Sequence, residues 1–210
     1  MPVTAADVPM SQVLTTSRTY LNDENATQFT DPVLIPKIQE AHRELQEELW
    51  VCGSPVVRGF SIVAYAAGTT ITGPTDMLCP TILFENTAAA VSTDTGWTPM
   101  TECFFLPLGV AKAATLGYWA WQQEVIQVIG ATVARAVGIQ YRRQVLIPSL
   151  ATDLIGILFG ESYLAARAAA MAAGSVGNAE VYAALSALAK ENLAKVISAN
   201  RGQQKPMIKP

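Results

Sequence analysis

The chain has 210 residues, of which 50% are hydrophobic and 15% are charged, and its formal net charge is -3. This length fits one domain, or one domain with an insertion, and it can bury a core without disulfides or metal. The slightly acidic balance excludes a generally basic protein that coats nucleic acid. The hydrophobic share is high for a soluble monomer, so we expect either a membrane segment or large contacts between proteins.

The most apolar windows do not fit a membrane span, which needs about 20 apolar residues with few charges. Residues 104–121 include Lys112, and residues 154–173 include Glu161 and Arg167. We therefore expect no membrane contact and assign the surplus hydrophobicity to contacts between subunits.

Cysteine usage predicts neither a disulfide framework nor a metal site. Cys52, Cys79 and Cys103 are odd in number, lie far apart and include no C-x-x-C pair. With His42 as the only histidine, they cannot complete a zinc shell without carboxylates. We expect reduced, buried thiols in a reducing cytoplasm, no metal and no cofactor.

Residues 1–55 predict two helices. Ser11 is a candidate cap for a short first helix. Thr30 and Asp31 predict the start of a second helix that runs to about Cys52. Its apolar positions recur at helical spacing, with glutamates on the other faces. This stripe consists of Leu34, Ile38, Ala41, Leu45 and Leu49.

Residues 56–147 predict a β-rich insertion. They are rich in Val, Ile, Thr, Tyr and Trp, and form six or seven short segments at a spacing typical of a small antiparallel sheet or sandwich. Residues 116–121 and 125–129 flank residues 122–124 and predict a hairpin, although the preferred Asn-Gly turn is missing.

Residues 148–199 predict a helical hairpin. A first helix, capped by Ser149 or Thr152, runs to about Ala173, residues 174–177 break it, and Asn178 caps a last helix. Residues 200–210 lack apolar periodicity and predict an extended arm. The fold class is therefore α+β: a bundle of about four helices, two N-terminal and two C-terminal, interrupted by an antiparallel β-rich insertion and followed by an extended C-terminal arm.

No constellation of residues points to an enzyme, and we expect no catalytic residues. His42 lies beside the predicted apolar stripe and is expected to be an ordinary helix-face histidine. The phosphate-binding and nucleophile-elbow motifs are absent. An enzyme that uses His42, Cys52 and Cys103 is the weakest alternative.

Two sets of side chains are candidates for contacts. Trp119 and Trp121 share one face of a predicted strand and Tyr118 lies on the other, which favours core packing or a subunit contact over base stacking because the surroundings are not basic. The second set is acidic and lies on the surface of the second helix. Acidic side chains in such positions are ordinarily solvated. It consists of Glu40, Glu44, Glu47 and Glu48.

Three stretches, taken in order along the chain, carry a family resemblance. The first combines residues 18–23, 28–31 and 34–45 and is similar to the pattern LND…TDxxLxxxxNxAxREL. The second, residues 116–132, resembles LGYWxWxxxxIxxxGAT, and the third, residues 193–206, resembles a last helix followed by NRxQQ. These patterns are those of the head-to-tail adaptor (connector) proteins of tailed bacteriophages, including longer members with a β insertion.

The resemblance implies a structural virion protein, assembled in the host cytoplasm, that forms a ring between portal and tail. Its partners are further copies of itself, commonly twelve in all, the portal protein, a tail or nozzle protein, and double-stranded DNA in transit through the lumen. Many members end in an Arg-rich tail. Here the arm that would dock on the portal is Asn200, Arg201, Gly202, Gln203, Gln204, Lys205, Pro206, Met207, Ile208, Lys209 and Pro210.

In such a ring, acidic helix faces line a channel without gripping phosphates, because like charges repel. Glu40, Glu44, Glu47 and Glu48 are the candidate channel acids. The candidate contacts with a subunit or with the tail are Tyr118, Trp119 and Trp121. The alternative function is a ligand- or carbohydrate-binding β domain on a helical oligomerisation stalk, with the same aromatic residues as its binding surface.

Overall fold

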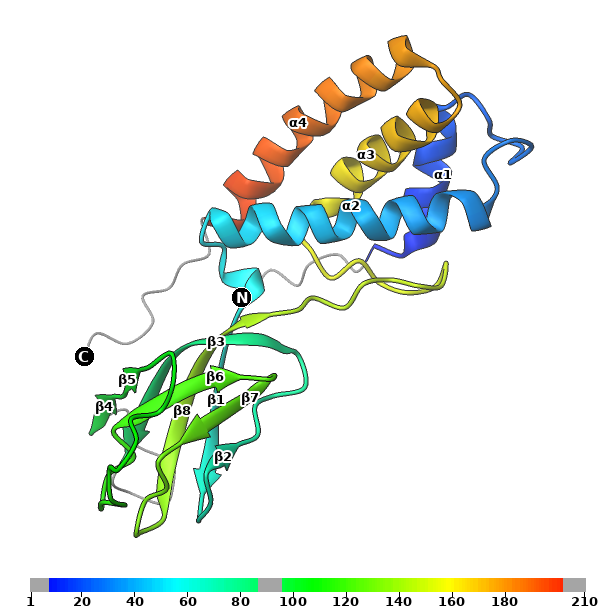
Figure 1. Cartoon of the computed structure of the whole chain (residues 1–210). Helices are drawn as coiled ribbons and strands as arrows, with labels where there is room; N and C mark the ends of the chain where they lie inside the picture. The colour runs from blue at the N-terminus through cyan, green and yellow to red at the C-terminus, as the bar shows by residue number, and fades with distance from the viewer. Residues whose placement is uncertain (1–7, 87–95, 202–210) are drawn as a thin grey trace. The chain divides into compact units, whose positions relative to one another are not determined.

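The computed structural model describes residues 8–86 and 96–201, and the chain divides into two compact units (Figure 1). The helical unit contains the described residues up to Val56 and from Val145 onward, and the β unit contains those between. The fold is α+β, with four helices and two sheets in the described ranges. None of the helices in these ranges has the length and apolar character that a membrane crossing requires.

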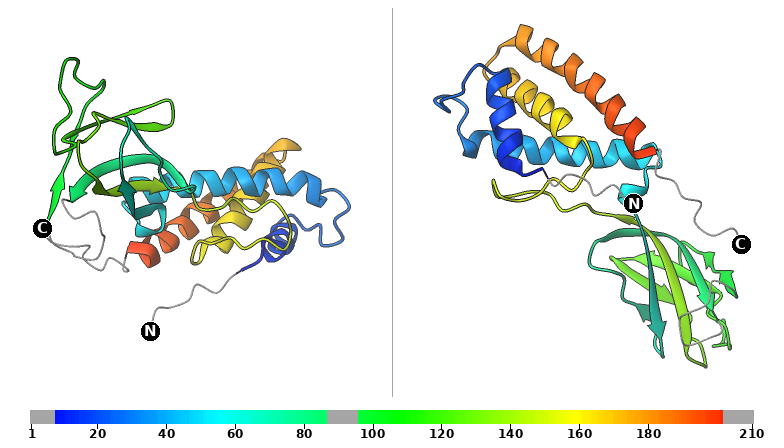
Figure 2. Two further views of the ribbon diagram at one scale, coloured as in Figure 1. Left: turned by 90° about the horizontal axis from the view of Figure 1, so that it is seen from below. Right: turned by 180° about the vertical axis from the view of Figure 1, so that it is seen from behind.

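The helical unit consists of α1 (Met10–Tyr20), α2 (Asp31–Val51), α3 (Gly160–Ser175) and α4 (Ala179–Arg201). α3 contacts the other three helices and lies between α1 and α4 (Figure 2). Its buried surface is mostly alanine, which allows neighbouring helices to approach closely. The predicted stripe of α2 is confirmed, because all five of its residues are fully buried.

The β unit contains two four-stranded sheets, preceded by a single 3₁₀ turn at Pro55–Val57. The order is β1-β8-β3-β4 in the first sheet and β2-β7-β6-β5 in the second. The strands are β1 (Arg58–Tyr65), β2 (Thr70–Ile71), β3 (Met77–Asn86), β4 (Trp97–Pro99), β5 (Thr101–Glu102), β6 (Tyr118–Gln122), β7 (Val125–Val128) and β8 (Arg135–Arg143).

One strand pair differs from the antiparallel expectation. β5 runs parallel to β6, whereas every other pair is antiparallel. Parallel neighbours need a long connection, and residues 103–117 provide it. The two sheets enclose one core, to which the first contributes Leu83, Val137 and Ile139 and the second contributes Trp119, Ile126 and Val128.

A helix was expected from about residue 149, but α3 begins only at Gly160. Residues 145–159, called the strap below, are irregular. Pro148 lacks a backbone donor, and Gly156 and Phe159 have φ angles of 67° and 57°, which no right-handed helix accepts. The apolar residues of the strap therefore recur at the spacing of a helix, although the backbone of the strap cannot form one.

The predicted hairpin of β6 and β7 is confirmed. Its two turn residues, Gln123 and Glu124, have φ angles of 51° and 62°. Two consecutive left-handed residues define a type I′ turn, which normally selects Asn-Gly because other side chains strain that backbone.

We therefore expect the double change Gln123→Asn and Glu124→Gly to stabilise the β unit by about 1 kcal/mol, since it relieves this strain. Thermal unfolding followed by circular dichroism measures the gain. A matched control, Glu102→Gly in β5, lies outside the left-handed region and should destabilise the chain. Destabilisation by both changes would contradict the assignment of the turn.

Candidate assembly surfaces

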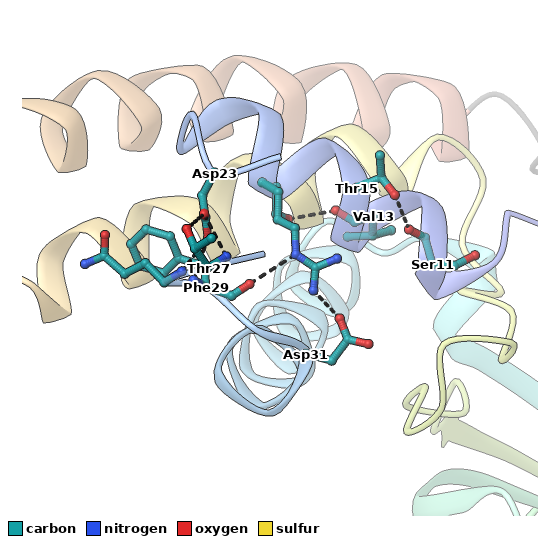
Figure 3. Close-up of polar contacts among 10 residues, drawn as sticks. Ser11, Val13, Thr15, Asp23, Thr27, Phe29 and Asp31 are labelled. Atoms are coloured by element: carbon teal, nitrogen blue, oxygen red, sulfur yellow. Dashed lines mark hydrogen bonds and ion pairs between the residues drawn. The ribbon is translucent and has the colours of Figure 1, made fainter. Parts of the chain in front are cut away.

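The connection between α1 and α2 folds around Asp23 (Figure 3). This buried carboxylate accepts hydrogen bonds from the N–H groups of Thr27, Gln28 and Phe29 at 2.9, 3.0 and 2.6 Å. The Thr27 hydroxyl donates a fourth, at 2.5 Å. These bonds, with that of the hydroxyl the strongest, lower the pKa of Asp23 to about 2.

Arg18 at the end of α1 completes this connection. Its Nε donates to the Phe29 carbonyl at 3.1 Å, and its guanidinium pairs with Asp31, the first residue of α2 (Figure 3). Thr30, which was expected to cap α2 through its hydroxyl, makes no such bond. The first motif of the family resemblance thus holds residues that fold the α1–α2 connection.

The four candidate channel acids of α2 do not share one environment. Glu44 is partly buried, and its two carboxylate oxygens accept hydrogen bonds from Arg167 of α3 at 2.7 and 2.9 Å. The hydrogen bonds from Arg167 lower the pKa of Glu44 and keep it ionised. Glu44 is thus turned toward α3 and is only partly exposed, which distinguishes it from the other three candidates. The exposed acids are Glu40, Glu47 and Glu48.

The three aromatic residues predicted as contacts also differ in burial. Trp119 is 1% exposed and lies in the core of the β unit, where its indole N–H has no hydrogen-bond acceptor among the described residues. Trp121 packs against the edge of that core, and Tyr118 is exposed. Trp119 is therefore a core residue, which corrects its assignment to a contact surface.

Two substitutions test this placement. Trp119→Ala should lower the free energy of unfolding by about 3–5 kcal/mol because it leaves a large cavity. Tyr118→Ala should change it by less than about 0.5 kcal/mol because the side chain is exposed. Urea unfolding of both variants measures the difference. If Trp119→Ala alters self-association but leaves stability unchanged, Trp119 belongs to a surface after all.

The first two residues assigned to the C-terminal arm belong to α4. Asn200 is 1% exposed, and its amide donates to the carbonyl oxygens of Leu158 and Val196 at 3.3 and 2.8 Å. Asn200 and Arg201 are thus helical, which corrects their assignment to an extended arm. The remaining residues assigned to the arm, 202–210, lie outside the described residues.

Two buried polar side chains of α2 fasten the strap. His42 is fully buried, and its Nε2 donates to the Ile155 carbonyl at 3.0 Å while its Nδ1 accepts from the Gln46 amide at 2.9 Å. Gln46 also donates to the Val145 carbonyl and accepts from the Val145 N–H, both at 2.9 Å. This clamp requires a neutral imidazole with its proton on Nε2. Burial lowers the pKa of His42.

The strap exposes apolar side chains although its backbone is fastened. Asp153 accepts the N–H groups of Ser149 and Leu150 at 2.8 Å, and Gln39 of α2 donates to the Pro148 carbonyl at 3.1 Å. An ordered segment with uncovered leucines is typical of a protein-contact surface. The exposed side chains are Leu146, Leu150, Leu154 and Phe159.

His42 is the only histidine, so its titration can be isolated. The unfolded chain binds a proton below about pH 6.5, whereas the folded pKa is lower. The contribution of neutral His42 is therefore complete above pH 6.5 and is lost as the pH falls. We expect the free energy of unfolding to drop by about 1 kcal/mol from pH 7 to 5.5.

Urea unfolding across this range measures the slope. His42→Asn should be less stable at pH 7 and should lose the slope, because it cannot titrate. The carboxylates with lowered pKa, which are Asp23, Glu44, Asp153 and Glu191, act at lower pH and do not interfere. An unchanged slope in His42→Asn would contradict the neutral clamp.

A second apolar segment lies in the connection between β5 and β6. Phe104 and Phe105 pack edge to face, with ring centroids 4.6 Å apart, yet are 86% and 67% exposed. Leu108 is 99% exposed and Val110 is 46% exposed. Residues 104–110, called the tip below, contain no charged residue.

The backbone around the tip is fastened at both ends. Gln122 donates to the Phe104 carbonyl at 3.0 Å, and Thr132 donates its N–H to the Ala113 carbonyl at 2.8 Å. The buried carboxylate of Glu85 accepts the Leu116 N–H at 2.9 Å, and buried Arg135 donates to the Ala114 carbonyl. The tip is thus an apolar surface on a fastened loop.

Neither the tip nor the strap is predicted from the sequence as a contact surface. A usable signal was present in both: apolar residues interrupted by proline and glycine, which break helices and weaken strands. Pro107 and Gly109 interrupt the tip, and Pro148 and Gly156 interrupt the strap. Apolar side chains on such segments cannot all reach a core.

Among the described residues, no three His, Cys, Asp or Glu side chains form a group able to hold a metal ion. No protein-family model and no curated protein matches the chain. The surfaces above and the resemblance of the three sequence stretches therefore carry the functional proposal.

Proposed function

We propose that the chain is a head-to-tail adaptor of a tailed bacteriophage, a structural virion protein without enzymatic activity. In this proposal about twelve copies form a ring between the portal and a tail or nozzle protein, and the genome passes through the lumen. The helices form one bundle that the β unit interrupts, and the residues after Arg201 form an arm that docks on the portal.

One observation carries the proposal beyond the sequence motifs. Each unit presents its own fastened segment of uncovered apolar side chains, the strap in the helical unit and the tip in the β unit. A monomer has no use for two such surfaces, whereas a subunit that joins neighbours and further proteins needs several.

The charge pattern agrees with a channel for DNA. α2 retains three exposed acids, Glu40, Glu47 and Glu48. Repeated around a ring, such acids repel phosphates and let a duplex slide. The residues from Arg201 onward contain three bases and no acid, which suits an arm that seeks an acidic partner.

The alternative, a carbohydrate- or ligand-binding β domain, loses its main support. It needs an exposed aromatic platform, but Trp119 is buried and Trp121 packs on the core. Tyr118 alone remains exposed from the set.

Mass photometry of the chain mixed with the portal ring of the same phage tests the adaptor function. The truncation should end at Arg201, because removal of Asn200 would unfasten the end of α4 from the Leu158 carbonyl. Full-length protein should join the portal as a ring of many copies. The truncated chain should bind at least about tenfold more weakly, because the arm is missing.

A variant with residues 202–210 in scrambled order serves as the matched control for composition and charge. If the portal recognises the order of residues in the arm, this variant should bind as weakly as the truncated chain. A full-length chain that never associates with the portal and stays monomeric or dimeric overturns the adaptor function.

A further inference from the structure

The first sheet has an outer face on which apolar side chains are partly exposed. In an antiparallel sheet, directly opposed residues point to the same side. Phe60, Gln140 and Ile82 are opposed in one row, and Ile62, Gly138 and Phe84 are opposed in the next. Their neighbours Leu83, Val137 and Ile139 point into the core, so these two rows form the outer face.

This outer face is apolar where a solvated face would be polar. Phe60 and Ile82 are 39% and 43% exposed, and Ile62 and Phe84 are partly exposed. Strands that face water on one side normally alternate apolar and polar residues, whereas apolar residues on both sides indicate a sheet covered on both sides. Such a face is typical of a sheet that packs against a further surface.

Two aromatic rings cover the middle of the face. A Cβ atom on Gly138 would stand 3.2 Å from the ring of Phe60 and 3.2 Å from the ring of Trp97. The two rings, one from β1 and one from β4, thus approach Gly138 from either side. The missing side chain lets both rings lie against the backbone of Gly138, so Gly138 is buried and the rings form the surface of the face at this point.

The tip is the matching surface of the same chain, but it cannot reach this face within one copy. The tip connects two strands of the second sheet, and its flanks are fastened to Gln122 of that sheet and to the inward-directed Glu85. The outer face of the first sheet points away from the second sheet. The two surfaces can meet only between copies.

We propose that the tip of one copy packs on the outer face of the first sheet in the next copy, with Phe105 directed toward the rings of Phe60 and Trp97. This contact is heterologous, since each copy offers the tip on one side and the face on the other, and such contacts form a ring when the rotation from one copy to the next closes. The contact supplies a subunit interface for the proposed ring, and the closure of that ring rests on the proposed function.

Area and charge agree with a second copy as the occupant. The four exposed side chains of the tip present about 500 Å², since a large aromatic side chain buries about 150–250 Å². With an equal area on the face, the contact reaches about 1,000 Å², the lower limit for a specific interface. The tip and the two rows contain no charged residue, and the adjoining arginine pair, Arg58 and Arg142, lies at the end of the strands, so a contact centred on the two rows buries no unpaired charge.

Disulfide cross-linking tests the contact in full-length chains whose native cysteines are first replaced by alanine. One chain then carries Phe105→Cys and the other carries Ile82→Cys. At about 1 mM protein, where a contact with a Kd of about 1 mM is substantially formed, the oxidised mixture should yield covalent dimers. Each single-cysteine chain alone should yield none.

Three outcomes overturn the contact. The first is an absence of dimers in the mixture. The second is efficient dimerisation of Ile82→Cys alone, which indicates a face-to-face dimer. The third is an equal yield when Val176→Cys, exposed in the turn after α3, replaces Ile82→Cys, which indicates random collision.

A second variant separates this contact from the adaptor function. Phe105→Glu with Leu108→Glu changes only exposed side chains and should lower self-association at least about tenfold, while Val176→Glu should not. If this double variant forms normal rings on the portal, the contact fails and the adaptor function stands. If the Phe105→Cys and Ile82→Cys chains cross-link as expected but the wild-type chain never binds portal, the contact stands and the adaptor function fails.

Discussion

The helical unit depends on the buried side of α2, which combines an apolar stripe with two polar side chains. Leu34, Ile38, Ala41, Leu45 and Leu49 exclude water, so the hydrogen bonds of His42 and Gln46 to the strap form where no solvent competes. Because the site is buried, a polar group left without its hydrogen-bond partner would lower the free energy of unfolding. The backbone of the strap, which has no regular structure of its own, is thereby held in one conformation.

Periodicity identified the elements whose pattern is local. The stripe of α2 and the β6–β7 hairpin could be predicted because their signals lie within a few turns or strand lengths. The start of α3 could not, because the strap has helical apolar spacing but is held by α2, about 100 residues earlier in the chain. The parallel pairing of β5 with β6 could not be predicted for a similar reason, because the long loop between the two strands sets the direction in which β6 runs.

The candidate surfaces were less predictable than the fold. Glu44 and Glu48 lie four residues apart on the same helix, yet Glu44 is bound by Arg167 of α3 and Glu48 is exposed. Residue type alone does not distinguish them. Trp119 likewise looks like a binding aromatic until the second sheet is placed over the first. In both cases the role depends on a partner distant in sequence.

The pairing of the first and last strands of the β unit has a consequence for how the chain can change over generations. Arg58 opens β1 directly opposite Arg142 near the end of β8, so the unit begins and ends at neighbouring points. A segment whose ends meet can be gained, lost or exchanged as one block without stretching the helices that flank it. Selection can therefore alter the β unit while α2 and the strap keep the helical unit unchanged.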